Sequence, residues 1–512
     1  MPDRALVYND DGWSSLMRYP APLTPADLVR VTVEPVAGTG VSIYQLGALG
    51  GHAVHYRSDF LPVVGALLER CDTMHVWRLQ ETVRHLRELG TDPVAVICEA
   101  CHQRGLAFQF SLRMNDRHHT YKRANGEWYF PELLSPWLLD HPELLLPDGG
   151  VDYAHPEVHA YRLRQAAEVL ERYDVDGIDL DFTRFRPWFA AGQEDSGRPL
   201  MTDLIRRLRE LIAAKKKTLS ARFEYDPEVC ERSGLAVGDW LAEGLLDQVT
   251  LGGVGDHTPD APSKWWVERA HATGARVFPG VEGQLHWIVS SGGGGQGMRA
   301  GKGVWDGFGP PSPEYLRAVA ARHYADGADG LSLFNFSCAD GPWDREVLSE
   351  LTDAERVASG DKQYVWAMWP WDAQIHGNEG WESRFVLEPG QAEGAFPLLL
   401  AEDVMQPRFG DANVTLTLEL KGLNRLDDVA VLLNLASLEW TGYHYNHYDH
   451  GCWNDIVQFT VPRTAVRCGE NALTLRRIQE SPGFEGKLEV RKCVLEIGYP
   501  HGFAPGRISN RR

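Results

Sequence analysis

The sequence has few cysteines and no long apolar run. The first argues against a disulfide-stabilised secreted domain, and the second argues against a membrane-spanning protein. Its 8 cysteines are scattered over 512 residues. Such scatter favours reduced thiols over the disulfide framework of a small secreted domain. No segment reaches the roughly 20 apolar residues of a membrane-spanning helix, and the N-terminus "MPDRALVYNDDGW" lacks a signal-peptide apolar run. We therefore expect a cytoplasmic protein.

Basic residues are in deficit as well. Lys and Arg number 51 against 71 Asp and Glu, which gives a formal net charge of -20. An acidic surface repels phosphate backbones and anionic lipids, so we expect neither nucleic acid nor a membrane as partner. The 43 % of hydrophobic residues and the length predict a folded protein of two domains.

Motifs for cofactors and metals are incomplete. "CEACH" (98–102) has the Cys-x-x-Cys-His spacing of haem attachment, but covalent haem requires export, and the segment is typical of a helix end. Zinc would require a second ligand pair, and the histidines at 118–119 and in 442–451 lack helical i,i+4 spacing. The Gly-rich "SSGGGGQG" lacks the Gly-Lys-Ser/Thr ending of a phosphate loop. We expect no cofactor and no metal.

Short apolar runs alternate with amphipathic helices over the first part of the chain. This alternation is typical of a (β/α)8 barrel or a doubly wound sheet. Pro156 indicates a helix start in 155–173, and Ser312 is the expected N-cap of a helix over 312–327. The predicted strands are 41–46, 106–112, 177–182, 218–223, 247–251, 275–281 and 330–336, with 73–77 as the eighth.

After about residue 360, the sequence consists of short segments with strand-type patterns, separated by turns. This predicts an all-β sandwich. The expected order of parts is an N-terminal extension (1–40), a (β/α)8 catalytic barrel (41–350), a linker (351–361), a β-sandwich accessory domain (362–503) and a tail (504–512).

Three predicted strands carry one polar face each, which favours the barrel over the doubly wound sheet. In "GIDLDF" (177–182), Ile178, Leu180 and Phe182 share one face, and Asp179 and Asp181 share the other. The strands at 107–113 and 218–224 show the same split. Helices cover both faces of a doubly wound sheet, whereas the second face of a barrel strand faces the lumen.

The polar faces place ionisable residues at the C-terminal strand ends, where barrel active sites lie. Arg113, Asp181 and Glu224 end three such strands, and Glu282 ends a fourth. The alternative is a structural lumen network, in which Arg113, Arg222 and the acids neutralise one another. Asp179 lies deeper in its strand and fits either interpretation.

Two long loops follow strands at the same end. Residues 113–152 form an aromatic loop, and residues 283–311 form a second one with the glycines 292–295, which is either a mobile lid or a disordered insertion. Flat aromatic faces stack on sugar rings, and we name Trp287 and Trp305 as candidate substrate-binding residues.

The segments "GLAFQFSLRMND" (105–116) and "DYAHPEVHAYRLRQAAEVLERYDVDGIDLDFTRF" (152–185) resemble the family-ten-like glycosyl hydrolases of the TIM-barrel glycosidase superfamily. The resemblance covers residues 100 to 190 and implies a (β/α)8 glycosidase, in which an accessory β-sandwich is frequent. The second segment is also similar to the Asp-x-x-Asp-x-Asp-x-Glu pattern of family 18 chitinases. Thr183 replaces the catalytic Glu of that pattern, which argues against chitinase-type chemistry.

Glycoside hydrolysis normally uses two carboxyl groups, an acid and a nucleophile or base. We assign Asp181 as the nucleophile or base, Glu282 as the first choice for the acid and Glu224 as the second. Expected binders of the carbohydrate substrate are Arg113, Asn115, Asp116, Asp179 and Arg184, with Asp116 a further acid candidate. A polysaccharide lyase with Tyr121 or His118 as base, and a non-catalytic carbohydrate-binding protein, are the alternatives.

Overall fold

We describe the protein from a computed structural model. The described residues are 4–47, 51–71, 73–120, 126, 128, 130–252, 263–283, 285–286, 308–309, 311–336, 345–367, 385–406, 412–449, 452–479 and 486–500. No helix within these ranges is both long enough and apolar enough to cross a membrane.

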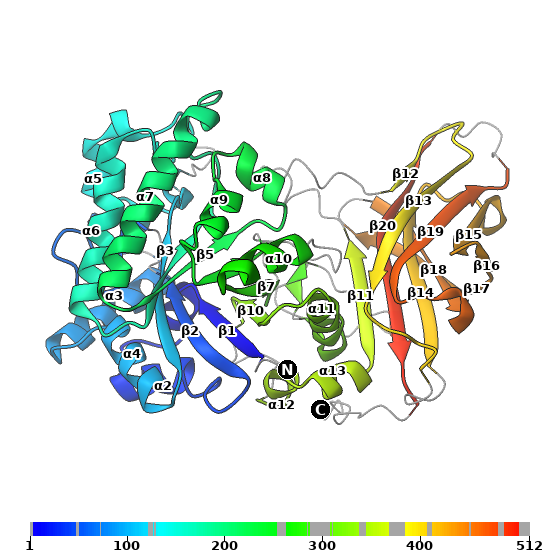
Figure 1. The fold of residues 1–512 in the computed structure, drawn as a ribbon, viewed down its shortest axis with the longest axis horizontal. Coiled ribbons are helices and arrows are strands. Elements are labelled where there is room, and N and C mark those ends of the chain that lie inside the picture. Colours follow the sequence, from blue (N-terminus) through cyan, green and yellow to red (C-terminus); the bar gives the residue numbers. More distant parts are fainter. Residues whose placement is uncertain are drawn as a thin grey trace. The chain divides into compact units, whose positions relative to one another are not determined.

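Parallel strands close into a barrel in the order β1-β10-β7-β6-β5-β4-β3-β2 (Figure 1). This confirms the predicted (β/α)8 architecture. The strands are β1 (Ala5–Asp10), β2 (Val41–Gly47), β3 (Ala107–Arg113), β4 (Gly177–Asp181), β5 (Thr218–Phe223), β6 (Gln248–Leu251), β7 (Arg276–Glu282) and β10 (Gly330–Phe334).

One predicted strand is wrong, and one barrel strand was missed. Residues 73–77 belong to the helix α3 (Met74–Glu88), whose buried side chains include Val76, Leu79 and Val83. These positions recur at helical spacing, which a five-residue segment is too short to reveal. The missing strand is β1, within the expected N-terminal extension, so the barrel begins at Ala5 rather than at residue 41.

Helices follow the barrel strands, as the alternation predicted. Pro156 occupies the first turn of α6, and Ser312 caps α11 by accepting a hydrogen bond from the Tyr315 N–H at 3.1 Å. The helices are α1 (Trp13–Met17), α2 (Pro25–Thr32), α4 (Pro93–Gln103), α5 (Pro136–Asp140), α6 (Pro156–Arg172), α7 (Glu194–Ala214), α8 (Pro227–Arg232), α9 (Val237–Ala242), α10 (Ser263–Thr273), α11 (Pro313–Ala325), α12 (Arg345–Glu350) and α13 (Ala354–Ser359). Short 3-10 turns are η1 (His118–Thr120), η2 (Pro131–Leu133), η3 (Pro142–Leu144), η5 (Leu426–Asp428) and η6 (Arg463–Ala465).

"CEACH" is the end of α4, as its pattern indicated. Cys98 and Cys101 are buried, and burial raises the pKa of both thiols, that of Cys98 to about 12. His102 pairs with Asp176 at 2.9 Å. Burial therefore disfavours the thiolate form of both cysteines.

Antiparallel sheets form the C-terminal sandwich. One sheet has the order β11-β20-β14-β18-β17, with β12 paired to β20, and the other has the order β13-β19-β15-β16. The strands are β11 (Lys362–Ala367), β12 (Val386–Leu387), β13 (Glu393–Leu400), β14 (Asn413–Lys421), β15 (Val429–Leu433), β16 (Ala436–Leu438), β17 (Trp440–Asp449), β18 (Cys452–Val461), β19 (Gly469–Arg477) and β20 (Leu488–Gly498), and a separate short pair joins β8 (Leu285–His286) to β9 (Phe308–Gly309).

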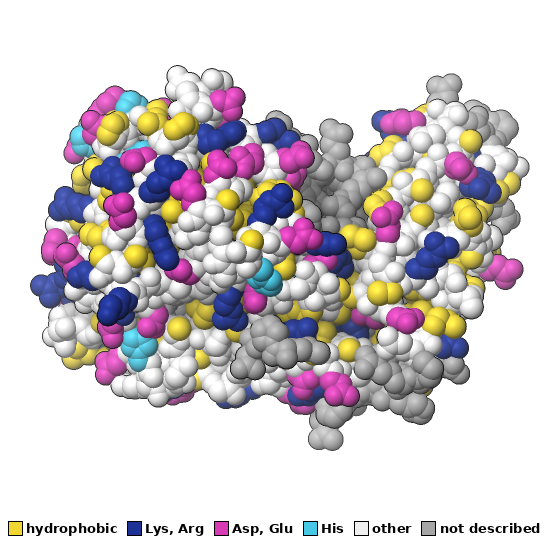
Figure 2. Space-filling model, viewed as in Figure 1, with side chains coloured by type: hydrophobic (Ala, Val, Ile, Leu, Met, Phe, Trp, Pro, Cys, Tyr) yellow, Lys and Arg dark blue, Asp and Glu magenta, His cyan; other side chains and the backbone are white. Residues whose placement is uncertain are grey.

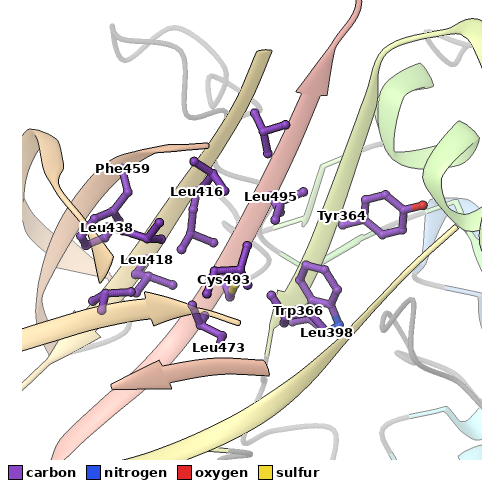
Figure 3. Packing of buried hydrophobic residues seen from close by; sticks show 14 of the residues in the cluster. Tyr364, Trp366, Leu398, Leu416, Leu418, Leu438, Phe459, Leu473, Cys493 and Leu495 are labelled. Carbon is purple, nitrogen blue, oxygen red and sulfur yellow. The ribbon is translucent and has the colours of Figure 1, made fainter. Parts of the chain in front are cut away.

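Side chains from both sheets of the sandwich meet in one apolar cluster. Figure 3 shows Leu416 of β14 and Leu495 of β20 in this cluster with Leu398 and Leu473 of the other sheet. Alternate residues of each strand therefore point into the interior, as expected for two packed sheets.

The described residues group into two compact units. Residues up to 252, with 263–283 and the described parts of 327–352, form the barrel unit. Helix α11 and the described residues from 353 onward group with the sandwich, although α11 precedes the last barrel strand in sequence. The expected linker 351–361 contains the helix α13.

Candidate active site

The barrel lumen changes from apolar to polar along its axis. Ala5, Val7, Ile43 and Phe278 form an apolar cluster at its N-terminal end. A chain of amides follows: Asn9 donates to Gln45 at 3.0 Å, Gln45 donates to Gln109 at 2.9 Å, and Gln109 donates to Gln248. The ionisable side chains lie beyond these amides, toward the C-terminal strand ends.

Strand register explains why the two carboxylates of β4 differ. Asp179 lies between Ser111 of β3 and Ser220 of β5, whereas Asp181, two residues later, lies between Arg113 and Arg222. Because lumen-facing residues alternate along each strand, this register stacks a layer in which serines flank Asp179 beneath a layer in which arginines flank Asp181. The polar faces predicted from the sequence are therefore lumen faces.

Asp179 is a fully buried part of the lumen network. The hydroxyls of Ser111 and Ser220 each donate to its carboxylate at 2.7 Å. Burial, aided by the charge of Asp181, raises the pKa of Asp179 to about 6. This supports the structural interpretation of Asp179, since the two serines occupy its oxygens.

Asp181 is buried at the C-terminal end of β4 and is held as an ionised group. Thr183 donates its backbone N–H at 3.0 Å and its hydroxyl at 2.7 Å to one carboxylate oxygen, and the Nε of Arg184 lies 3.7 Å from the other. Burial alone would raise the pKa of Asp181. Three arginines, Arg222, Arg184 and Arg113, and the Thr183 hydroxyl more than offset this, so the pKa lies below its ordinary value.

Arg113 and Asp116 form a second charged group at this end of the barrel. The Nη1 of Arg113 lies 2.8 Å from Asp116, and its Nη2 lies 3.6 Å from Asp11. His118 donates its backbone N–H to Asp116 at 3.0 Å, and its Nδ1 lies 2.8 Å from the same oxygen. Burial raises the pKa of Asp116, but His118 and Arg113 bring it well below its ordinary value.

Asn115 fixes loops rather than presenting a free amide. Its Nδ2 donates to the Pro187 carbonyl at 2.9 Å, and its Oδ1 accepts from the Val151 N–H at 3.1 Å. The side chain thus joins the loop after β3 to the loop after β4. Its role as a substrate binder stays a prediction.

Arg184 and Arg222 lie against the ring of Phe334 at the end of β10. Their guanidinium carbons are 4.8 Å and 4.0 Å from the ring centroid. Arg222 donates its Nε–H to the Gly252 carbonyl at 3.0 Å, but its buried Nη1 has no hydrogen-bond partner among the residues that the structure describes. Burial, with the nearby charge of Arg113, lowers the pKa of Arg184 to about 10.

The two acid candidates lie at the same end of the barrel. Glu282 is buried and pairs in register with Phe334, and β7 lies three positions from β4 in the barrel order. Glu224 directly follows β5, the neighbour of β4, and is partly exposed. Their convergence with Asp181 on one cleft stays a prediction. Trp287, Trp305 and Tyr121 lie outside the described residues, as do the glycines 292–295.

Sequence reasoning missed the acids that end β1. Asp11 approaches Arg113, and Asp10 accepts hydrogen bonds from the Tyr44 hydroxyl at 2.8 Å and the Gly12 N–H at 2.9 Å. Burial, with the charge of Asp11, raises the pKa of Asp10 to about 6. The signal was present, because "ALVYNDDG" places two acids and a glycine directly after a short apolar run.

The described residues contain no group of three or more His, Cys, Asp or Glu side chains that could hold a metal ion.

Comparisons with known proteins found similarity in structure only. No protein-family model matches the chain, and no curated protein sequence matches it. The family-ten-like resemblance therefore stays a prediction.

The solved structures that match include several glycoside hydrolases. Alpha-L-fucosidase isoenzyme 2 from Paenibacillus thiaminolyticus is 16 % identical with a TM-score of 0.41, and the match covers 70 % of this chain and 50 % of the fucosidase chain. A catalytic domain of a group II chitinase from Ostrinia furnacalis is 14 % identical with a TM-score of 0.39, covering 68 % and 95 % of the two chains. The PgaB (BpsB) glycoside hydrolase domain from Bordetella bronchiseptica is 15 % identical with a TM-score of 0.39, covering 69 % and 99 %. At these TM-scores the matches carry no argument about the activity of this chain.

Proposed function

We propose that the chain is a glycoside hydrolase that cleaves an oligo- or polysaccharide, with Asp181 as its nucleophile or base. The observation that carries the proposal is the buried carboxylate of Asp181 at the C-terminal end of β4, in register with Arg113 and Arg222 and 3.7 Å from the Nε of Arg184. These arginines lower the pKa of Asp181, although its burial opposes them. Catalytic residues of barrel enzymes lie at these strand ends. A nucleophile or base must also be deprotonated before the reaction begins.

The second carboxyl group of the mechanism is Glu282, with Glu224 as the alternative. The acid protonates the leaving oxygen while Asp181 attacks the anomeric carbon or activates a water molecule. An acid must retain its proton near neutral pH, which a location beside apolar surface favours. Glu282 is 9 % exposed and pairs in register with Phe334, so it meets that requirement better than Glu224.

The test measures reducing-sugar release from a panel of oligosaccharides by the full chain and by Asp181→Asn. Asn keeps the shape of Asp but cannot act as nucleophile or base. We expect the rate to fall on the order of a thousandfold or more, an increase of about 4 kcal/mol in activation free energy. Asp174→Asn is the control, since Asp174 belongs to the same sequence motif but is exposed and paired with Lys217 at 2.8 Å.

Two results would contradict the proposal. If Asp181 only neutralises arginines, Asp181→Asn should lose roughly 3–5 kcal/mol of stability and keep near-normal activity per folded molecule. If the ultraviolet absorbance of an unsaturated uronate rises without hydrolysis, the chain is a lyase instead.

A further inference from the structure

Two buried arginines, Arg184 and Arg222, lie at the C-terminal end of the barrel. The described residues around them do not accept hydrogen bonds from all of their N–H groups. Arg222 is 3 % exposed and Arg184 is 7 % exposed. Within the described part of the chain, the Nη1 of Arg222 and the Nε of Arg184 have no hydrogen-bond partner. A buried charged donor without a partner costs considerable free energy, so such groups are normally satisfied by water or by a ligand.

The acids nearby do not supply the missing partners. Among the described residues, Arg184 makes one ion pair, the 3.7 Å contact with Asp181, and Arg222 makes none within 4.0 Å. One oxygen of Asp181 is already occupied by Thr183. Arg113, the third arginine of the group, is paired with Asp116 and approaches Asp11. Among the described residues, the two arginines therefore share one carboxylate within 4.0 Å, that of Asp181, and it contacts Arg184 alone.

Phe334 orients both guanidinium groups. Both lie over its ring, and the Nε–H of Arg222 is held by the Gly252 carbonyl at 3.0 Å. Stacking and this hydrogen bond fix the plane of Arg222, and no described residue accepts a hydrogen bond from its Nη1. A fixed guanidinium edge donates N–H groups in set directions, so it binds the charged acceptor oxygens of an oxyanion better than a neutral hydroxyl.

We propose that Arg222 and Arg184 form a subsite for the anionic substituent of a sugar, so that the substrate is an acidic glycan. This rests on the proposed function and names its substrate class. A carboxylate of a uronic acid and a sulfate ester present the same oxyanion chemistry to the two arginines. The binding experiment distinguishes these two sources.

The experiment measures binding of D-glucuronate, D-galacturonate, D-glucose 6-sulfate and D-glucose to the full chain by isothermal titration. We expect at least one acidic sugar to bind about tenfold or more tightly than glucose, a difference of about 1.4 kcal/mol. Arg222→Gln should remove this preference. The control is Arg206→Gln on α7, which removes the same charge from an exposed ion pair with Glu243. This variant should retain the preference for the acidic sugar.

Arg184→Gln provides a second variant if Arg222→Gln does not fold, and it should weaken the same preference. Glucose binding as tightly as every acidic sugar would overturn the inference, as would a preference that survives Arg222→Gln in the folded protein. Hydrolysis of neutral glycans alone, sensitive to Asp181→Asn, would leave the glycosidase proposal standing and remove the subsite. Binding of acidic sugars without any turnover would do the reverse.

Discussion

Asp179 and Asp181 differ in their environments although they lie two residues apart on one strand. Asp179 accepts from two serine hydroxyls inside the lumen, and burial raises its pKa to about 6. Asp181 lies in the next layer, and its arginine neighbours bring its pKa below the ordinary value. Environments that separate the pKa values of two carboxyl groups are typical of sites where one group must be ionised.

The raised pKa of Asp179 predicts a specific dependence of stability on pH. The folded state binds this proton more tightly than the unfolded state, whose pKa is near 3.8. The stabilisation from Asp179 is therefore complete below about pH 4 and is lost as pH rises to about 6, on the order of 3 kcal/mol in all. Asp179→Asn, a neutral isostere, should flatten the decline in unfolding free energy over this window.

Urea unfolding at several pH values between 4 and 7 measures this effect. Asp10 titrates in the same window for the same reason, so part of the decline should remain in the variant. Asp174→Asn is the control, because the pKa of Asp174 is lowered by Lys217 and lies outside the window. A slope that does not change in Asp179→Asn would show that folding does not raise the pKa of Asp179.

Part of the site was predictable from strand parity, the alternation of side chains between the two faces of a strand. Parity placed Asp179, Asp181 and Arg113 on lumen faces, and the register confirms this placement. Sequence could not show that the Nη1 of Arg222 lacks a partner among the described residues, or that Thr183 donates hydrogen bonds to Asp181. Both depend on how neighbouring strands and loops align, which no local pattern specifies.

At the scale of elements, the strands and helices with strong periodicity were predictable. Seven barrel strands lie where alternating or continuous apolar runs predicted them, and α6 and α11 begin at their predicted residues. β1 was missed because its apolar run is short and is followed at once by acids. Its identity as a strand depends on pairing with β2 and β10, which are distant in sequence.

The N-cap of α11 gives a prediction at this scale. Ser312→Ala removes the hydroxyl that accepts from the Tyr315 N–H at 3.1 Å, and we expect a loss of about 1 kcal/mol. Ser312→Thr keeps the hydroxyl and should lose only a few tenths of that value. Chemical denaturation of the three proteins measures the difference, and equal losses in both variants would show that the cap does not stabilise the helix.

At the scale of the whole molecule, the barrel unit and the sandwich unit differ in the polarity of their interiors. The barrel unit encloses the polar lumen, whereas the sandwich unit is built around a separate apolar cluster. Ala318 of α11 belongs to that cluster together with Tyr364 and Leu416. On the face shown in Figure 2, Lys and Arg side chains are interspersed with Asp and Glu, so the acidic excess is spread rather than gathered there.

The two units should unfold in separate transitions, because each has its own core. Leu416→Ala, at a fully buried position of the sandwich, should lower the stability of one transition by about 2–5 kcal/mol. Leu204→Ala, at a fully buried position of α7, should lower the other transition by a similar amount. Differential scanning calorimetry measures both.

The transition that each variant shifts shows whether α11 unfolds with the sandwich or with the barrel. Because α11 shares the sandwich cluster, Ser312→Ala should shift the transition that Leu416→Ala shifts and leave the other where it is. The reverse result would place α11 with the barrel, as its position in the sequence suggested. A single transition that moves in all three variants would mean that the barrel and the sandwich fold as one cooperative unit.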